Sequence, residues 1–260
     1  MLHDALNLEL VTLPGAATAW PSPLSIAVAL NEVVLIEGAT PSAAVPLLEV
    51  AATLQSPVVG MVRHWTQIAE NLPREELYQL RARIAYISPR QVLLHRLSLG
   101  ENIALAPCYH MECSVSEALE PHADLLEHLK LQAHLDQFPA QVSAGVYARA
   151  LWARELLKGP ELILATISGD LAAAGAPMLL TVLQDYLSLY GAAAVLVGES
   201  LEPYYPLGQR LLRLEAGQLL TMPTLEHRAR PLTAYLPLVR TELSAISRQP
   251  TLSLPPDSIC

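Results

Sequence analysis

Residues 142–164 have the sequence VSAGVYARALWARELLKGPELIL. Ser143 is a favourable helix cap, and the apolar residues after it recur at helical spacing as far as Lys158. Gly159 and Pro160 end this predicted helix, and residues 161–165 are apolar enough to form a buried strand. The stretch therefore predicts a helix that leads into a buried strand, a repeating unit of layered α/β domains.

A strand, a turn and a helix are also predicted near the N-terminus. Residues 31–54, NEVVLIEGATPSAAVPLLEVAATL, indicate a short apolar strand, a turn over 38–45 and a helix over 46–54. This order is the frame of a phosphate-binding loop, whose pattern is Gly, four residues, Gly, Lys and then Ser or Thr. Gly38 matches the first glycine, but the other three positions fall at Ala43, Ala44 and Val45.

Each of these three departures removes a chemical group that phosphate binding uses. The lysine neutralises the outer phosphates, the hydroxyl is a Mg²⁺ ligand, and glycine lets backbone amides converge without an intervening Cβ. Taken alone, the segment is an ordinary strand–turn–helix unit. One alternative stays open, in which Thr40 and Ser42 supply unconventional phosphate contacts.

Composition and charge exclude several classes of protein. The net charge of −9 and the pI of about 5.3 argue against a nucleic-acid surface, which needs clustered Lys and Arg. No apolar run is long enough for a membrane span, and no basic, then apolar, signal sequence is evident at the N-terminus. Three cysteines are an odd number, which favours a reducing compartment, so we expect a cytosolic protein.

The rest of the chain predicts alternating strands and helices after an initial β-rich part. We expect a hairpin of strands 24–28 and 33–37, and a second hairpin over 211–220 that turns at Ala216 and Gly217. The other predicted strands are 7–13, 84–87 and 192–197, and the other predicted helices are 73–83, 115–136 and 175–189. Residues 223–260 are expected to be a C-terminal extension, helical over part of 232–247 and disordered over the last twelve or so residues.

Together, residues 7–222 resemble the nucleotide-binding subunit of an ATP-binding cassette (ABC) transporter. Residues 24–38 are similar to the approach to its phosphate loop, and residues 77–87 and 99–107 to the stretch around its glutamine loop. Residues 142–164 are similar to its Leu-Ser-Gly-Gly signature, the signature helix and the strand of its second nucleotide motif. The apolar Val146 directly after the signature favours, weakly, the Mla/Mce-type phospholipid-transport branch.

The resemblance implies an α/β fold, a P-loop NTPase-like cassette. It would have an antiparallel β portion, a mixed or parallel core sheet and a helical subdomain over about residues 88–155. The predicted domain is residues 1–222. The helical region around 88–140 would dock transmembrane permease subunits. In the extension, an apolar patch could hold a partner subunit, and its members would be Tyr235, Leu236, Leu238 and Val239.

Every position that carries chemistry in the family is altered in this chain. The glutamine that touches Mg²⁺ falls at Pro89, or at Gln91 if the alignment slips by two residues. The remaining positions are the metal-supporting aspartate at Thr166, the catalytic glutamate at Ile167 and the switch histidine at Glu199. Trp20 is a weak substitute for the aromatic residue that stacks on adenine. Because phosphoryl transfer depends on positioning and charge neutralisation, we expect no ATP hydrolysis by this chain alone.

The signature survives as Ser143, Ala144 and Gly145. In the family, the signature of one subunit caps the nucleotide held by the other, so ATP and Mg²⁺ are expected only through a partner subunit. The protein would pair with an intact ABC ATPase, or form a homodimeric scaffold, on the cytoplasmic side of the inner or plasma membrane. Three alternatives remain: Ser143 is only a helix cap, the chain is a nucleotide-binding ATPase with unconventional site residues, or it is a stand-alone scaffold.

Two other kinds of site have little support. Cys108 and Cys113 enclose a histidine, but no second Cys/His pair at zinc-like spacing occurs, so we expect a loop and no metal site. A hydrolase turn of the Gly-x-Ser-x-Gly type is also missing from the sequence.

Overall fold

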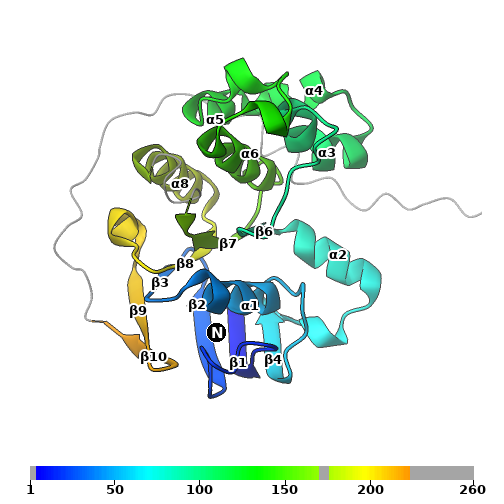
Figure 1. The fold of residues 1–260 in the computed structure, drawn as a ribbon. Coiled ribbons are helices and arrows are strands. Elements are labelled where there is room, and N and C mark those ends of the chain that lie inside the picture. The colour runs from blue at the N-terminus through cyan, green and yellow to red at the C-terminus, as the bar shows by residue number, and fades with distance from the viewer. Residues whose placement is uncertain (1–3, 170–175, 223–260) are drawn as a thin grey trace, which may run out of the picture. The chain divides into compact units, whose positions relative to one another are not determined.

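The computed structural model describes residues 4–169 and 176–222, which contain two β-sheets (Figure 1). The smaller sheet is antiparallel, in the order β2-β1-β4-β5, and consists of β1 (Asp4–Thr12), β2 (Leu24–Ala29), β4 (Val59–His64) and β5 (Gln67–Ile68). The larger sheet has the order β10-β9-β3-β8-β7-β6. Its strands are β3 (Val33–Glu37), β6 (Ile84–Ile87), β7 (Leu162–Ile167), β8 (Ala193–Gly198), β9 (Arg210–Glu215) and β10 (Gln218–Thr221). Only the β9–β10 pair of the larger sheet is antiparallel.

Helices cover both faces of the larger sheet. The α-helices are α1 (Pro41–Ala51), α2 (Arg74–Ala82), α3 (Leu99–Met111), α4 (Val115–Leu119), α5 (Ala123–His128), α6 (Ala144–Leu156) and α8 (Ala176–Tyr190). Short 3₁₀ helices join them: η1 (Ala69–Asn71), η2 (Glu120–His122), η3 (Gln132–His134), η4 (Pro139–Gln141) and η5 (Glu202–Leu207). In Figure 1, α3 to α6 and α8 lie on one side of the sheet, and α1 and the antiparallel strands lie on the other.

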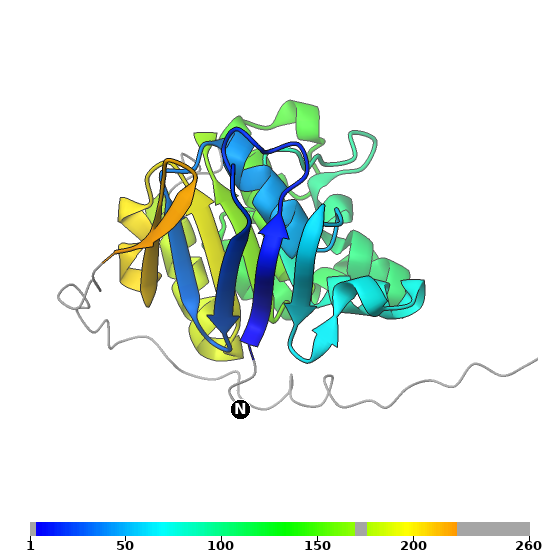
Figure 2. The same cartoon turned by 90° about the horizontal axis from the view of Figure 1, so that it is seen from below.

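The alternation of side chains along the central strands explains this layering. Val34 and Ile36 of β3 pack in the cluster formed with α1 and the antiparallel sheet, whereas Val33 and Leu35 pack in the cluster formed with the helices above. All five residues of β3 are buried, as expected for a parallel strand covered on both faces. The antiparallel strands alternate between buried and accessible residues, and their accessible face forms the layer nearest the viewer in Figure 2.

The predicted fold class is confirmed, with an antiparallel β portion, a largely parallel core sheet and helices between β6 and β7. The hairpin at Ala216 and Gly217 is confirmed as β9–β10. The predicted helices 73–83 and 143–158 correspond to α2 and α6. The predicted extension, residues 223–260, lies outside the described residues.

The predicted hairpin of strands 24–28 and 33–37 is wrong. β2 pairs with β1 in the small sheet, and β3 lies between β8 and β9 in the large one. At the turn between them, Asn31 has a φ of 62°, and the Glu32 carboxylate accepts the Ala29 amide at 2.8 Å and pairs with Arg210 at 3.1 Å. The turn therefore carries the chain from one sheet to the other.

The single helix predicted over 115–136 is also wrong. Pro121 lies in the short η2, and Lys130 has a φ of 51°, so the segment divides into α4, η2, α5 and η3. The loop expected around Cys108 is instead the last turn of α3, and Cys113 follows this helix. The strands β4 and β5 were not predicted. Every helix in the described part of the chain is too short or too polar to cross a membrane.

Candidate nucleotide site

The predicted site positions gather at the carboxyl edge of the parallel sheet. Glu37 and Ile167 both lie in register with Gly198, and Ile87 lies in register with Ala165. The residues that follow these strands, among them Gly38, Pro89 and Glu199, therefore lie along one edge. This is the edge at which open α/β sheets bind ligands.

The structure corrects the predicted phosphate loop. Residues 41–45 are not loop but the first turn of α1, which begins at Pro41 with Thr40 as the N-cap. The amides of Ala43 and Ala44 donate to the Thr40 carbonyl at 2.9 and 2.8 Å, and Pro41 has no amide hydrogen to offer. The amides at the positions of the second glycine and the lysine of a phosphate loop are therefore used within the helix here.

The start of the same segment is bound to the neighbouring strand. The Gly38 amide donates to the Glu199 carbonyl at 3.3 Å, and the Ala39 amide donates to the Gly198 carbonyl at 3.1 Å. Gly38 has a φ of 82°, and a Cβ added to it would lie 2.9 Å from the Leu214 carbonyl oxygen. The close approach of Leu214 and the positive φ therefore require a glycine at position 38, whether or not a phosphate binds there.

Thr40 and Ser42, the alternative phosphate contacts, are exposed, and their hydroxyl groups lie 2.9 Å apart in a mutual hydrogen bond. Trp20 is only 3% exposed, and its indole N–H donates to the Ala43 carbonyl at 3.0 Å. Trp20 thus supports the first turn of α1 from the core. It has no free ring face for stacking on adenine, so the sequence-based suggestion for Trp20 is wrong.

Thr166 and Ile167 lie at the end of β7 and are both buried. The Thr166 hydroxyl has no hydrogen-bond partner in the described structure. A buried hydroxyl and a branched hydrocarbon carry no negative charge with which to hold Mg²⁺ or a water molecule bound to it. The metal-binding and base functions expected at these two positions in the family therefore have no chemical counterpart here.

The segment after β6 presents Pro89 to solvent and turns Gln91 toward α6. The Gln91 Nε2 donates to the Glu155 carboxylate at 3.1 Å. Between them, Arg90 pairs with Glu49 of α1 at 2.9 Å. In the alternative prediction, Gln91 takes the place of the family glutamine. The structure shows the Gln91 side chain bonded to Glu155 of α6.

Glu37 is a residue of this edge that the sequence analysis missed. Its carboxylate accepts hydrogen bonds from the Leu201 amide at 3.1 Å, the Tyr205 hydroxyl at 2.9 Å and Arg213 at 3.0 Å. Burial alone would raise the pKa of Glu37, but these donors together hold the pKa below its usual value. A charged residue closing the apolar run VVLIE was the signal that could have identified it.

Glu37 joins β3 to η5 and β9, and the amide of the next residue, Gly38, bonds to the Glu199 carbonyl. The Glu199 side chain is exposed. The edge therefore carries two carboxylates. One of them, Glu37, forms an ion pair with Arg213. This arrangement is unfavourable for a polyanion such as ATP.

The predicted signature lies at the start of α6. Ser143 is the N-cap, and its Oγ accepts the Val146 amide at 3.4 Å, so its role as a helix cap is confirmed. Ser143 and Ala144 are exposed, and Gly145 is partly exposed. The capping bond occupies the hydroxyl only weakly, because 3.4 Å is longer than an ordinary hydrogen bond. Access to these residues from solvent is thus retained.

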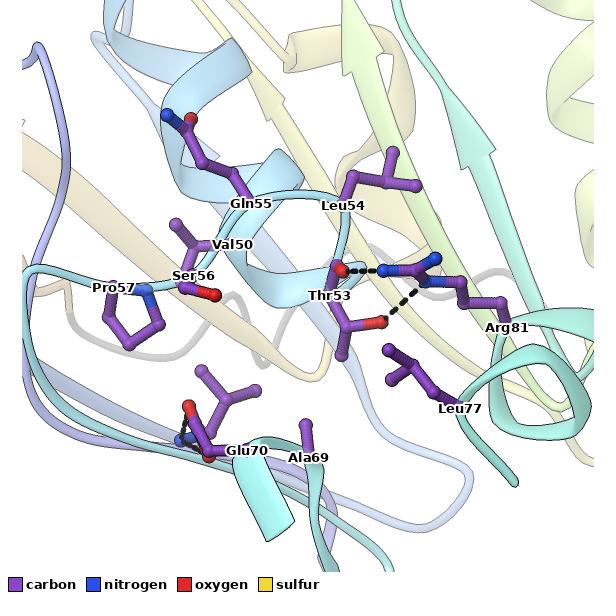
Figure 3. A pocket seen from close by; sticks show the side chains of 11 residues that line it. Val50, Thr53, Leu54, Gln55, Ser56, Pro57, Ala69, Glu70, Leu77 and Arg81 are labelled. Carbon is purple, nitrogen blue, oxygen red and sulfur yellow. Dashed lines mark hydrogen bonds between the residues drawn. The ribbon is translucent and has the colours of Figure 1, made fainter. Parts of the chain in front are cut away.

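Two cavities open at the surface of the described residues. A cavity of about 130 Å³ lies between the end of α1, β4 and α2, where Arg81 donates its Nε to the Thr53 hydroxyl at 3.1 Å and a second N–H to the Thr53 carbonyl (Figure 3). Another, of about 280 Å³, lies between Trp20 and the β9–β10 turn. Of the predicted site residues, only Trp20 lines either cavity. In the described part of the chain, no group of three or more His, Cys, Asp and Glu is placed to hold a metal ion.

The fold is similar to that of solved cassette structures. The dimeric structure of MJ0796, a bacterial ABC transporter cassette, superimposes with a TM-score of 0.70 at 22% identity, covering 82% of this chain and 96% of that one. The structure of cbiO1 from Clostridium perfringens, part of an ABC transporter complex, gives a TM-score of 0.66 at 13% identity and covers 84% of this chain and 87% of that one. These likenesses establish the fold alone.

No protein-family model matches the chain. The lipoprotein-releasing system ATP-binding protein LolD of Shewanella frigidimarina is 30% identical over 186 residues, which are 68% of this chain and 74% of LolD. The chain belongs to the ABC ATP-binding protein family. LolD 2 of Chlorobaculum tepidum is 29% identical over 203 residues, 75% of the cassette chain and 81% of that protein.

A further relative is much longer than this cassette. The macrolide export ATP-binding/permease protein MacB of Campylobacter jejuni is 33% identical over 176 residues, 67% of this chain. That match spans only 27% of the length of MacB. The likeness to MacB therefore concerns only a part of that protein.

Proposed function

We propose that this cassette is a catalytically degenerate subunit of a membrane transporter. It does not hydrolyse ATP at its own site, and it completes the site of an intact ABC ATPase partner through Ser143, Ala144 and Gly145. The observation that carries the proposal is the first turn of α1, in which the amides of Ala43 and Ala44 donate to Thr40. A site in which these two amides are engaged, and which lacks the lysine and the metal ligand, does not neutralise the charge of the transferred phosphoryl group.

The relatives are named as ATP-binding proteins, and by likeness to them this chain would be expected to bind ATP at its own site. The proposal departs from that expectation. The alternative is a nucleotide-binding ATPase that uses the exposed hydroxyls of Thr40 and Ser42. Those hydroxyls bring no positive charge, and the neighbouring Glu199 repels the γ-phosphate. A stand-alone scaffold is the other alternative, and it would purify without membrane components.

The partners in the proposal are transmembrane permease subunits and a second cassette, with the chain at the cytoplasmic side of the membrane. The relatives are named for lipoprotein release and macrolide export, which are both tasks of membrane transporters. Lipid or lipid-linked cargo is part of our proposal. The Mla/Mce-type branch remains a prediction from Val146 alone.

The experiment is an ATPase assay of the whole complex, purified from its native membranes through a tag on this chain. We expect the chain alone to be inactive and the complex to hydrolyse ATP. Replacing Gly145 with Asp should lower the rate of the complex by at least about tenfold, because it puts a carboxylate against the partner's nucleotide. The matched control, Glu199→Gln, should leave the rate within about twofold. Hydrolysis by the chain alone, or an unchanged rate in the Gly145 variant, would contradict the proposal.

A further inference from the structure

The helices α3 to α6 are an insertion between β6 and β7 of the larger sheet. Two connections join this insertion to the sheet, residues 88–98 after β6 and residues 157–161 before β7. α6 can rotate relative to the sheet only if both connections bend. Side chains that hold both connections would therefore fix the orientation of α6, which carries Ser143 at its first turn (Figure 1).

Glu155 lies where the two connections meet. It is in the last turn of α6, is only 6% exposed, and has an ion pair with Lys158 of the second connection at 2.5 Å. Its carboxylate also accepts Gln91 Nε2 of the first connection at 3.1 Å and the Tyr86 amide of β6 at 3.4 Å. The buried carboxylate of this α6 residue thus contacts the sheet and both connections.

The three residues of the first connection that follow Gln91 each bond to the helical insertion. The Val92 carbonyl accepts Arg154 Nη1 of α6 at 2.9 Å, and the Leu93 amide donates to the Tyr147 hydroxyl of α6 at 2.7 Å. The Leu94 amide donates to Asn102 of α3 at 2.7 Å. Residues 91–94 therefore bond to the helical insertion without a break.

A buried carboxylate is unfavourable unless it stays paired and hydrogen-bonded. The donors to Glu155 come from both sides of the junction, so a rotation of α6 would remove Gln91 and the Tyr86 amide from it. The carboxylate would then be left buried with fewer partners. This penalty favours one orientation of the insertion, and no bound ligand is needed to select it.

We propose that Glu155 is a positioning residue that holds α6, and with it Ser143 to Gly145, in one fixed orientation on the sheet without nucleotide. The functional meaning of this orientation rests on the proposed function, since a signature that serves a partner must be presented while the chain's own site is empty. Glu155 acts through Gln91, Tyr86 and Lys158 and does not itself touch a ligand.

The test is hydrogen–deuterium exchange with mass spectrometry on the full chain. In Glu155→Ala, amides in residues 86–94 and in the first turn of α6 should exchange at least about tenfold faster than in the unmodified chain, while β8 is unchanged. The matched control is Arg90→Ala, which removes an ion pair from the same connection but on the α1 side. It should not accelerate exchange in α6.

A second variant keeps the test decisive if Glu155→Ala does not fold. Gln91→Ala removes one bond to Glu155 and leaves the buried ion pair intact. The exchange rate should therefore rise in the same residues, but by less than in Glu155→Ala. Unchanged exchange at residues 86–94 in both variants, or an increase spread evenly over β7 and β8, would overturn the proposal.

The proposed function is judged separately by adding millimolar Mg²⁺-ATP to the unmodified chain. Slower exchange over residues 38–45 would mean that the chain's own site binds nucleotide, and the proposed function would then fail. The localised effect of Glu155→Ala would still decide whether Glu155 positions α6.

Discussion

His64 lies at the end of β4 with its side chain fully buried. Burial, and to a smaller extent the nearby charge of Arg83, lowers the pKa of His64 to about 4, from an ordinary value of 6.5. Between these two values the unfolded chain binds a proton and the folded chain does not. The contribution of His64 to stability is therefore complete above pH 6.5 and is lost as the pH falls through 4, by at most about 3–4 kcal/mol.

Urea unfolding of the unmodified chain and of His64→Gln, at pH 7, 5 and 4, checks this prediction. The variant should lose less free energy of unfolding between pH 7 and 4 than the unmodified chain loses. The exposed His95 provides the control, because His95→Gln should retain the full pH dependence. Identical pH profiles for the unmodified chain and His64→Gln would show that His64 does not carry this titration.

Ala44 is the position at which the family has its phosphate-binding lysine, and here it is fully buried against the core around α1. Restoring the lysine should therefore destabilise the fold and not create a site. We expect Ala44→Lys to lower the free energy of unfolding by roughly 3–5 kcal/mol, since a buried ammonium would have no partner. Ser42→Lys, exposed in the same turn, should cost under about 1 kcal/mol.

Denaturant unfolding of both variants measures these costs, and an ATP titration completes the comparison. A stable Ala44→Lys variant that binds Mg²⁺-ATP would show that the edge can open into a functional phosphate loop. It would contradict the account of α1 given above.

Single residues differed in how far sequence could predict them. Ser143 as a helix cap followed from residue type and the apolar helix behind it. Glu37 and Glu155 were missed because their roles depend on donors far away in sequence, such as Arg213 and Gln91. Trp20 was misjudged for the same reason, since its partner Ala43 is 23 positions away.

At the scale of elements, α1 shows why the phosphate loop was placed wrongly. The phosphate-loop pattern put a loop over 38–45 and a helix over 46–54. In the structure Pro41 takes the first position of the helix and Pro46 lies inside it. A proline early in a helix does not by itself show which proline starts it.

The connection into α3 depends on Asn102, which is fully buried. Its side chain accepts the Leu94 amide at 2.7 Å and donates to the carbonyls of Leu94, Leu97 and Ser98. Removing it leaves the Leu94 amide and the Leu97 carbonyl without these partners, whereas the carbonyls of Leu94 and Ser98 keep backbone donors, so Asn102→Ala should lower the free energy of unfolding by roughly 2–4 kcal/mol. Thermal and urea unfolding measure this loss.

The adjacent Glu101 is the control for Asn102. It forms the capping box with Ser98, and its side chain accepts the Ser98 amide at 2.7 Å at an exposed position. Glu101→Ala should cost about 1 kcal/mol. Equal losses in the two variants would mean that the buried network adds nothing beyond capping.

The two hairpin predictions differ in whether the strand pairing depends on the local turn residues or on distant parts of the chain. β9–β10 was predicted correctly because its turn residues, Ala216 and Gly217, have φ values of 49° and 78°, which suit a tight turn. The β2–β3 hairpin failed because β3 is buried on both faces and pairs with β8 and β9. A run of apolar residues does not reveal from which parts of the chain its neighbours come.

For the whole molecule, the order of segments carried more information than any one motif. The phosphate-loop frame, the glutamine-loop region, the signature and the following strand predicted the layered cassette, and the structure confirms that fold. The internal contacts that hold the carboxyl edge, made by Glu37 and by the first turn of α1, could not be predicted. They depend on how β3, η5 and β9 are brought together by the finished sheet.

The central claim is that the carboxyl edge of this cassette does not bind Mg²⁺-ATP. Calorimetric titration of the purified chain with Mg²⁺-ATP, together with its thermal unfolding, tests the claim most directly. We expect no saturable heat and no rise in melting temperature at millimolar ATP. Saturable binding would contradict the account, since ligand at 100 times its dissociation constant would add about 2.7 kcal/mol of stability and raise the melting temperature visibly.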